Sequence, residues 1–290
     1  MKQLVQSSRT GEMDLLDTPV PVAQAGMVVV RNAASLVSAG TERALVDFAK
    51  KNLLQKARSR PDLVAQVKEK IQRDGVLTTL ETVQTRLDTP MALGYSSAGV
   101  VIDVGAGVSE FAMGDRVACA GFGYAVHAEA VTVPVNLVTK LPESVSFEDA
   151  AFTTLGAIAL QGIRQATPQL GDNVAVIGLG LLGQLTVQLL QANGCRVFGI
   201  DLDPARVALA HALGATATAG RQEAAVAGSH FTNGHGFDIV LITADTRSND
   251  PLLLAGELAR DKGVVVAVGA VGMEVPRKAY YMKELDLRLS

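Results

Sequence analysis

Hydrophobic and polar positions follow two different patterns along the chain. In residues 1–40, short apolar stretches such as 27–31 alternate with glycines and prolines, and the same pattern returns in residues 90–141. Short runs of this kind are typical of β-strands joined by tight turns. From residue 146 onward, apolar runs of five or six residues alternate with longer stretches of helical spacing. Buried strands that alternate with helices predict a parallel sheet covered on both faces.

The pattern also predicts individual elements. Ser146 is followed three residues later by Asp149, as in a capping box, so a helix should begin there and we place the domain boundary after residue 145. Before that boundary, strands are expected at 2–7, 12–17, 27–31, 98–104, 116–120, 128–134 and 137–141. After it, strands at 173–177, 196–200, 238–242 and 263–268 alternate with helices at 181–192, 204–213 and 252–260.

Residues 42–88 interrupt the β-rich part. This segment holds ten Lys or Arg and seven Asp or Glu, with one glycine and one proline. Apolar residues at helical spacing predict a helix that begins at Pro61 and ends at Asp74-Gly75, and a second helical face over 77–87. The segment is either a lid or partner surface or a solvated helical elaboration, and the charge pattern favours the second.

Composition narrows the class of protein. Of 290 residues, 48% are hydrophobic and 19% charged, so the chain can bury a core and is not disordered. A net charge of −3, with eight Phe, four Tyr and no Trp, gives no support for binding nucleic acid. Two cysteines cannot form a disulfide framework. We see no signal peptide and no apolar run of ~18 residues, so we expect a cytoplasmic protein without a membrane span.

A glycine motif carries the strongest functional signal. Gly178-Leu179-Gly180-Leu181-Leu182-Gly183 is a G-x-G-x-x-G sequence between a predicted strand and a predicted helix, which is the context of a dinucleotide site. Gly178 permits the tight turn, Gly180 the approach of a pyrophosphate, and Gly183 the close packing of helix on strand. The N–H groups at the start of the helix would face the phosphates.

Asp201 ends the next strand, 18 residues after Gly183. A carboxylate there accepts hydrogen bonds from ribose hydroxyls and repels a 2′-phosphate, which favours NAD(H) over NADP(H). Arg206, one helical turn further on, would soften that preference. Thr243, Ala244, Gly269 and Val271 follow later strands, where ligands of such sheets bind.

The order strand–GLGLLG–helix–strand–Asp, behind a β-rich part with GDRV at 114–117, resembles the medium-chain dehydrogenase/reductase superfamily. The resemblance implies an α/β protein: a GroES-like β-barrel catalytic domain over 1–145, with a helical insertion at about 42–88, and a doubly wound Rossmann NAD-binding domain over 146–290. It also implies that Thr243, Ala244, Gly269 and Val271 contact the cofactor. Other matching blocks are PVPVAQAGMVVVRNAASLVSAGTE (19–42), LGYSSAGVV (93–101), HAEAVTVP (127–134) and FEDAAF (147–152).

The chain departs from the superfamily where zinc-dependent members bind their metal. Ala39 stands in place of the cysteine of an ICGTD block, Tyr95 in place of the histidine of a GHE block, and Leu155 in place of a further cysteine. Alanine and leucine have no donor atom, and tyrosine is a weak zinc ligand. We therefore expect no metal and a zinc-independent mechanism.

Without zinc, another group must meet the charge on the substrate oxygen. The resemblance places Tyr95, Thr41 and Glu42 in blocks that line the cleft between the domains. Tyr95 is the best candidate for a hydrogen-bond donor, although a packed aromatic ring is an equally good interpretation. Thr41 matches a hydroxyl that relays the alcohol proton in relatives, and Glu42 would orient its neighbours. His127 is expected to be a half-buried structural residue at the start of a strand.

Three functions remain open. The first is a zinc-independent NAD(H)-dependent oxidoreductase for a polar alcohol, ketone or sugar-like substrate. The second is a quinone or enoyl reductase, against which Asp201 counts because such enzymes usually take NADPH. The third is a silent NAD-binding module of a larger oxidoreductase. SLVSAGTER and LGAIALQGIR resemble the first half of bi-domain oxidoreductases, which are fused to a Gfo/Idh/MocA-type module. Relatives continue beyond a strand like 283–289, so we expect that a return segment is missing; a homodimer or a partner oxidoreductase is also open.

Overall fold

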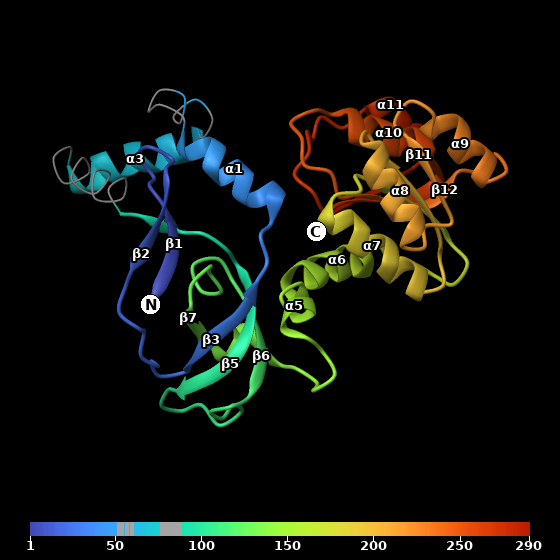
Figure 1. Ribbon diagram of the computed structural model, residues 1–290. Helices are drawn as coiled ribbons and strands as arrows, with labels where there is room; N and C mark the ends of the chain where they lie inside the picture. The colour runs from blue at the N-terminus through green and yellow to red at the C-terminus, as the bar shows by residue number, and fades with distance from the viewer. Residues whose placement is uncertain (51–54, 56–57, 59–60, 76–88) are drawn as a thin grey trace. The chain divides into compact units, whose positions relative to one another are not determined.

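The computed structural model describes residues 1–50, 55, 58, 61–75 and 89–290 (Figure 1). The chain divides into two compact units, Met1–Thr154 and Leu155–Ser290. Each unit has its own sheets and its own hydrophobic core. Two separate cores are what two domains require.

Unit 1 is built on two antiparallel sheets of short strands. The larger sheet has the order β7-β3-β5-β6-β8 and the smaller has the order β2-β1-β4. Val28, Val30 and Val101 are buried together, as expected for β-branched side chains on the covered face of a sheet. The strands are β1 (Lys2–Gln6), β2 (Met13–Asp17), β3 (Met27–Ser35), β4 (Met91–Ala92), β5 (Ser96–Val104), β6 (Arg116–Ala120), β7 (Ala130–Pro134) and β8 (Val138–Lys140).

Two helices of the predicted insertion are described, α1 (Ala39–Ala49) and α3 (Pro61–Asp74). The predicted limits of the second are confirmed: it starts at Pro61, and Gly75 follows Asp74 with φ +87° and donates its N–H to the carbonyl of Ile71. Positive φ suits glycine as a helix terminator. The helical face predicted over 77–87 lies outside the described residues. α1 begins three residues before the predicted insertion, so Thr41 and Glu42 lie at the start of a helix.

Ser146 begins the short helix α5 (Phe147–Ala150), as predicted. Its Oγ accepts a hydrogen bond from the N–H of Asp149 at 3.0 Å, which satisfies one of the open donors of the helix start. Ala150 packs with Ala98 and Ala118 of the larger sheet. Because α5 is buried against these strands, unit 1 runs to Thr154, beyond the predicted boundary after residue 145.

Unit 2 contains a single six-stranded sheet in which all neighbouring strands are parallel. Its order is β11-β10-β9-β12-β13-β14, so the chain moves outward from β9 first in one direction and then in the other. This is the order of a dinucleotide-binding Rossmann sheet, with the crevice for ligands between β9 and β12. The strands are β9 (Asn173–Ile177), β10 (Arg196–Asp201), β11 (Ala217–Gly220), β12 (Phe237–Ile242), β13 (Ala259–Ala267) and β14 (Asp286–Leu289).

Helices cover both faces of this sheet, which confirms the doubly wound α/β prediction. Along β9, Val174 and Val176 pack into one apolar cluster, whereas Ala175 and Ile177 pack into another. The first cluster includes residues of α6, α7 and α8, and the second includes residues of α9, α10 and α11. The helices are α6 (Thr153–Ala166), α7 (Leu181–Ala192), α8 (Pro204–Ala212), α9 (Ala224–Phe231), α10 (Asp250–Leu258) and α11 (Arg277–Met282).

Some element bounds differ from the prediction. The strand expected from residue 263 begins at Ala259, because Ala259 already pairs with Phe237 ahead of a register shift. The last strand begins at Asp286 rather than near Lys283, which immediately follows α11. A short 3-10 turn (Val135–Leu137) precedes β8. Among the helices of the described residues, none has the length and apolar character that a bilayer crossing requires.

Candidate functional site

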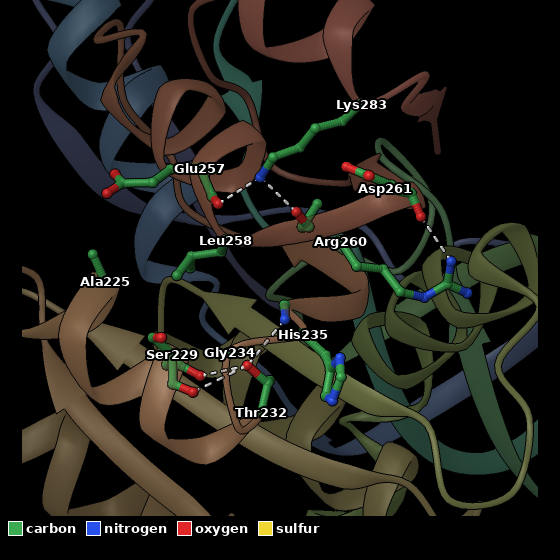
Figure 2. Close-up of a pocket in the computed structure, with 13 residues that line it drawn as sticks. Ala225, Ser229, Thr232, Gly234, His235, Glu257, Leu258, Arg260, Asp261 and Lys283 are labelled. Carbon is green, nitrogen blue, oxygen red and sulfur yellow. Dashed lines mark hydrogen bonds between the residues drawn. The ribbon is translucent and has the colours of Figure 1, made fainter.

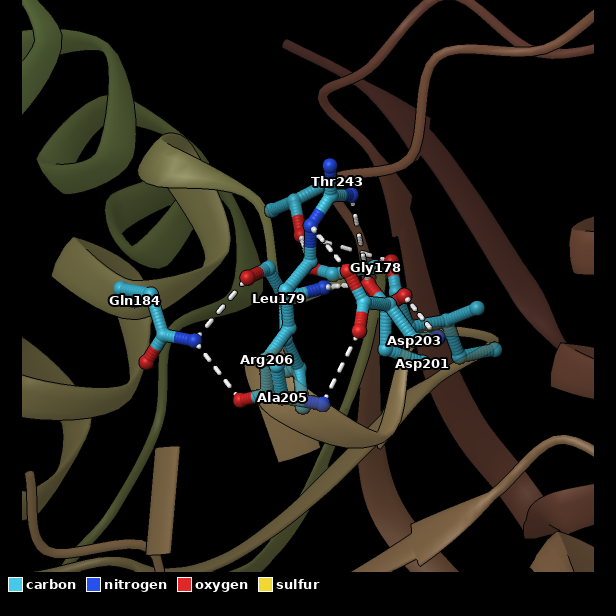
Figure 3. A network of polar contacts seen from close by, with 9 residues as sticks. Gly178, Leu179, Gln184, Asp201, Asp203, Ala205, Arg206 and Thr243 are labelled. Carbon is cyan, nitrogen blue, oxygen red and sulfur yellow. Dashed lines mark hydrogen bonds and ion pairs between the residues drawn. The ribbon is translucent and has the colours of Figure 1, made fainter. Parts of the chain in front are cut away.

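The glycine motif forms the turn between β9 and α7. Gly178 has φ +97°, and a β-carbon there would lie 2.6 Å from the backbone nitrogen of Ala244. Thr243 Oγ1 donates a hydrogen bond to the carbonyl oxygen of Gly178 at 2.5 Å. The end of β12 therefore presses on the first glycine and holds it (Figure 3).

The other two glycines of the motif differ in their surroundings. A β-carbon on Gly183 would overlap the carbonyl oxygen of Gly178, so only glycine lets α7 pack this close to the turn. Gly180 is the N-cap of α7, and nothing lies within 4 Å of the place a β-carbon would take. No side chain of the described residues caps the helix, so the N–H groups of Leu181, Leu182 and Gly183 are open to an anion.

Asp201, the last residue of the neighbouring strand β10, is hydrogen-bonded to the glycine turn. Its Oδ2 accepts from the N–H of Leu179 at 2.6 Å, and its Oδ1 accepts from the N–H of Asp203 at 2.9 Å. The Arg206 guanidinium lies 4.0 Å from Asp201 and 3.5 Å from Asp203 (Figure 3). Each carboxylate oxygen can accept more than one hydrogen bond, so Asp201 retains capacity for ribose hydroxyls.

Gln184 was not predicted as part of this site. It is buried on α7, and its Nε2 donates to the carbonyl of Leu179 at 2.9 Å and to the carbonyl of Arg206 at 3.0 Å (Figure 3). One side chain thus joins the glycine turn to the first turn of α8. The sequence signal that could have pointed to it is a glutamine directly after the G-x-G-x-x-G motif, on a helix that is otherwise strongly apolar.

Two loops at the same edge of the sheet are tied together by Asn249. Its Nδ2 donates to the carbonyl of Glu274 at 3.0 Å, and its Oδ1 accepts from the N–H of Glu274 at 3.1 Å. The N–H of Thr246 donates to the carbonyl of Ala270 at 2.8 Å. The loop after β12, with Thr243 and Ala244, is therefore fixed to the loop after β13, with Gly269 and Val271.

All the predicted cofactor residues thus lie at the carboxyl ends of four neighbouring strands, in the loops that follow them, or in the first turns of the helices α7 and α8. The open N–H groups of α7, the space at Gly180 and the carboxylate of Asp201 fit the pyrophosphate and ribose of a nicotinamide dinucleotide. The helix N–H groups can donate to an anion, and the Asp201 carboxylate can accept from hydroxyls.

The three predicted catalytic residues belong to unit 1. Glu42 is buried, with Oε1 accepting from the N–H of Ser38 at 2.8 Å. Thr41, beside it, is exposed. Tyr95 is half-buried in the segment before β5, and within the described part of the chain its hydroxyl has no hydrogen-bond partner. Tyr95 therefore has a free donor, whereas Glu42 is already engaged.

His127 is a partner that the sequence interpretation missed. Its Nε2 lies 3.1 Å from Glu42 Oε2 and its Nδ1 lies 2.8 Å from Ser35 Oγ. The prediction that a strand begins at His127 is wrong, since β7 begins at Ala130 and His127 lies in the preceding loop. His127 lies 92 residues from Ser35 and 85 from Glu42, so no local pattern could have linked it to them.

The positions that bind zinc in relatives do not fit the metal. Ala39 and Leu155 offer no donor atom, and Tyr95 alone could not hold an ion. Within residues that the structure describes, no group of three or more His, Cys, Asp or Glu side chains is arranged to hold a metal.

A cavity of about 640 Å³ opens at the other end of the unit 2 sheet, by the starts of β12 and β13 (Figure 2). It is lined by Glu257, Asp261, His235 and Lys283, among others. The Lys283 ammonium donates to the carbonyls of Gly256, Glu257 and Ala259, and burial lowers its pKa. This lysine closes the end of α10 and is not free to bind a ligand. The cavity lies away from the carboxyl ends where the glycine turn is found.

The chain matches two sequence families over different parts. Residues 67–143 match the alcohol dehydrogenase GroES-like domain, and residues 182–290 match the family described as zinc-binding dehydrogenase. The two matches fall in unit 1 and unit 2 respectively.

Individual relatives agree with these matches. Over 237 residues the chain is 31% identical to the "Putative D-xylulose reductase" of Rhizobium meliloti (strain 1021), covering 70% of this chain and 67% of that protein. It is 30% identical over 156 residues to the (R,R)-butanediol dehydrogenase of Bacillus subtilis, a match that spans 45% of either protein. The crystal structure of a Pseudomonas syringae quinone oxidoreductase superposes with a TM-score of 0.70 at 22% identity, over 100% of this chain and 80% of that one. That likeness shows the fold alone.

Proposed function

Since the chain belongs to the medium-chain dehydrogenase/reductase superfamily, among its zinc-type alcohol dehydrogenase-like members, we propose that it is an NAD(H)-dependent oxidoreductase that works without zinc. Members of this superfamily bind nicotinamide cofactors. The observation that carries the proposal is the glycine turn beneath an uncapped helix start, with Asp201 beside it.

The preference for NAD(H) is supported by the carboxylate of Asp201. A 2′-phosphate would meet that negative charge, whereas free ribose hydroxyls would donate to it. Arg206 faces Asp201 and Asp203 and is thereby partly neutralised. It opposes the preference only weakly, because those two carboxylates compete for it.

The proposed chemistry divides between cofactor and protein. A bound nicotinamide supplies the carbon that accepts or gives up a hydride. The chain supplies hydrogen bonds to the reacting oxygen and a route for its proton. We assign the first task to the free Tyr95 hydroxyl, with Glu42 as an orienting group. Thr41 is the relay hydroxyl that the resemblance suggests, but no base touches it among the described residues.

The proposed substrate is a polar secondary alcohol, the matching ketone, or a sugar-like polyol. Relatives that carry the names D-xylulose reductase and butanediol dehydrogenase support this class. The decisive experiment is calorimetric titration of the chain with NAD⁺, NADH, NADP⁺ and NADPH, followed by turnover assays on diols, polyols and their ketones. Binding of NAD⁺ and NADH, with oxidation of a polyol at the expense of NAD⁺, is the expected result, and tighter binding of NADPH would contradict it.

Two other functions are distinguished by the same assays. Turnover of a quinone or an enoyl substrate in place of a polyol would indicate the quinone or enoyl reductase class. Tight NADH binding without any turnover would indicate a silent module that serves a fused or partner oxidoreductase. Asp201 counts against the quinone or enoyl reductase, and the missing donor atoms at Ala39 and Leu155 support the silent module.

A further inference from the structure

We propose that Ser35, His127 and Glu42 form the proton relay of unit 1, with Ser35 as the residue that meets the substrate oxygen. The proposal rests on the proposed function, because a dehydrogenase must move a proton for each alcohol that it oxidises. The three side chains form one unbroken hydrogen-bonded chain, with 2.8 Å between Ser35 Oγ and His127 Nδ1 and 3.1 Å between His127 Nε2 and Glu42 Oε2.

The three hydrogen-bonded side chains differ in their exposure to solvent. The side chains of His127 and Glu42 are only 9% and 10% exposed, whereas Ser35, the last residue of β3, is exposed. An imidazole and a carboxylate are therefore shielded from water and reach the surface through a hydroxyl. Imidazole is the side chain that exchanges protons most readily near neutral pH.

Both ring nitrogens of His127 are hydrogen-bonded, and further hydrogen bonds hold the backbone around it. The N–H of His127 donates to the carbonyl of Leu93 at 2.8 Å, and its carbonyl accepts from the N–H of Leu4 at 2.9 Å. Asn32 Nδ2 donates to the carbonyls of Val126 and Ala128, on either side of it. Such a fixed ring meets the requirement that an acid–base group be set in position before the reaction.

The ring also lies beside the predicted oxygen-binding residue. A β-carbon on Gly94, which has φ +95°, would lie 3.0 Å from both Cδ2 and Cε1 of His127. The imidazole thus packs directly on the backbone of Gly94, and Tyr95 is the next residue. The absence of a side chain at Gly94 is what admits the ring.

The hydrogen bonds determine where the protons lie. An ionised carboxylate only accepts, so the hydrogen between Glu42 and His127 is on Nε2. Nδ1 of the neutral ring is then bare and accepts the hydrogen of the Ser35 hydroxyl. This leaves the lone pairs of Ser35 Oγ facing outward, where they can take a proton from a substrate.

The proposed step balances as follows for alcohol oxidation. The hydroxyl proton of the substrate passes to Ser35 Oγ while the Oγ hydrogen passes to His127 Nδ1. The electrons of the broken O–H bond form the second C–O bond of the carbonyl, and the C–H hydrogen would leave with its electron pair as a hydride, for which a bound oxidised nicotinamide would be the acceptor. The ring becomes an imidazolium beside the Glu42 carboxylate, and the proton returns to water through Ser35. Reduction follows the same route in reverse.

The tautomer can be tested without any substrate or cofactor. Two-bond ¹H–¹⁵N spectra of the chain, assigned with His127→Gln, should show the neutral ring protonated on Nε2. Glu42→Gln should weaken that preference, because an amide can donate to Nε2 as well as accept from it. A neutral ring protonated on Nδ1 in the wild-type chain would overturn the relay.

Kinetics test the role itself. Ser35→Ala and His127→Gln should lower kcat by about 10²-fold, the usual effect of losing a general base, while Ser35→Thr restores it and NADH affinity stays within about twofold. His211→Gln, on the exposed face of α8, is the control. A merely structural link between α1 and β3 would instead lower the melting temperature without a selective loss of kcat, and unchanged kcat in both variants would overturn the proposal. A wild-type chain with the expected tautomer and no turnover would count against the proposed function, not against the hydrogen-bonded arrangement.

Discussion

Thr243 donates its hydroxyl hydrogen to the carbonyl oxygen of Gly178 across 2.5 Å, which ties the end of β12 to the first glycine of the turn after β9. The same hydroxyl lies 3.0 Å from the place where a β-carbon on Gly183 would stand. Three separate segments thus define one turn, and a change in any of them should alter the edge of the sheet where we propose that the cofactor binds.

Alanine at two glycines of the turn should weaken NADH binding in both cases but lower the stability of the fold in only one. Gly183→Ala should lower the melting temperature and abolish NADH binding, because its β-carbon overlaps the carbonyl of Gly178. Gly180→Ala should melt within about 2 °C of wild type, since its β-carbon meets open space, yet bind NADH at least tenfold more weakly because a pyrophosphate needs that space. Thermal melts and fluorescence titration measure both. Equal behaviour of the two variants would contradict this account.

Asp201→Asn should narrow the preference between NADH and NADPH. The amide removes the charge that repels a 2′-phosphate and weakens the hydrogen bonds to ribose, an effect of about 1–3 kcal/mol in NADH affinity. Calorimetric titration of both nucleotides measures the ratio of their dissociation constants. Asp261→Asn is the control, because Asp261 lines the cavity at the other end of the sheet, away from the glycine turn. An unchanged ratio in Asp201→Asn would exclude Asp201 as the selector.

The purified chain should contain no stoichiometric zinc, and EDTA should leave its NADH binding and turnover intact. The reason is the lack of donor atoms at Ala39 and Leu155. Elemental analysis by mass spectrometry is the measurement. One zinc per chain would contradict the prediction.

Tyr95→Phe should lower turnover by at least tenfold while NADH affinity is unchanged. It removes the hydroxyl proposed to donate to the reacting oxygen, a loss that costs about 10²–10³ in turnover in well-studied enzymes, and it keeps the aromatic ring. Steady-state kinetics on the best substrate test it, with Tyr124→Phe, an exposed tyrosine, as the control. Turnover equal to wild type would favour the packed-aromatic interpretation of Tyr95.

Acid should weaken the stabilising effect of one ion pair in unit 2. Arg221 donates to both oxygens of Asp250, at 2.6 and 2.7 Å, and these hydrogen bonds hold the pKa of that carboxyl below its ordinary value of 3.8. A lowered pKa stabilises the fold above pH 3.8, and this contribution disappears as the pH falls through the lowered value. Asp250→Asn should therefore cost about 0.5–1 kcal/mol at pH 7, as for partly exposed pairs, and less at pH 2.5, where protonation of the carboxyl removes part of the contribution. Denaturant melts at both pH values, with Asp245→Asn as control, would contradict it if the difference persisted undiminished in acid.

Local signals predicted most of the fold. Pro61 and Gly75 bound α3, Ser146 begins α5, and the strands of the parallel sheet are continuous apolar runs, because each of these features acts on residues close in sequence. The glycine turn belongs to the same class, since strand, turn and helix are consecutive. The doubly wound Rossmann arrangement was implied by the superfamily resemblance rather than by any of these signals, and no order of the strands was predicted.

Contacts between residues far apart in the sequence could not be predicted from these local signals. His127 reads as an isolated histidine because Glu42 and Ser35 lie 85 and 92 residues away. Gln184 reads as one more polar residue of a helix, although its amide spans the turn and α8. The domain boundary was set too early because the apolar face of α5 does not reveal which of two cores it will join.

The bond between Asn249 and Glu274 has a consequence for the speed of nucleotide binding. Two loops that are already joined at both a donor and an acceptor have little conformational freedom left to lose when a ligand arrives. The loops lose their conformational entropy when the chain folds, and not when the complex forms. Association should then proceed as a single diffusive encounter, with a rate constant linear in nucleotide concentration and no slow isomerisation after it.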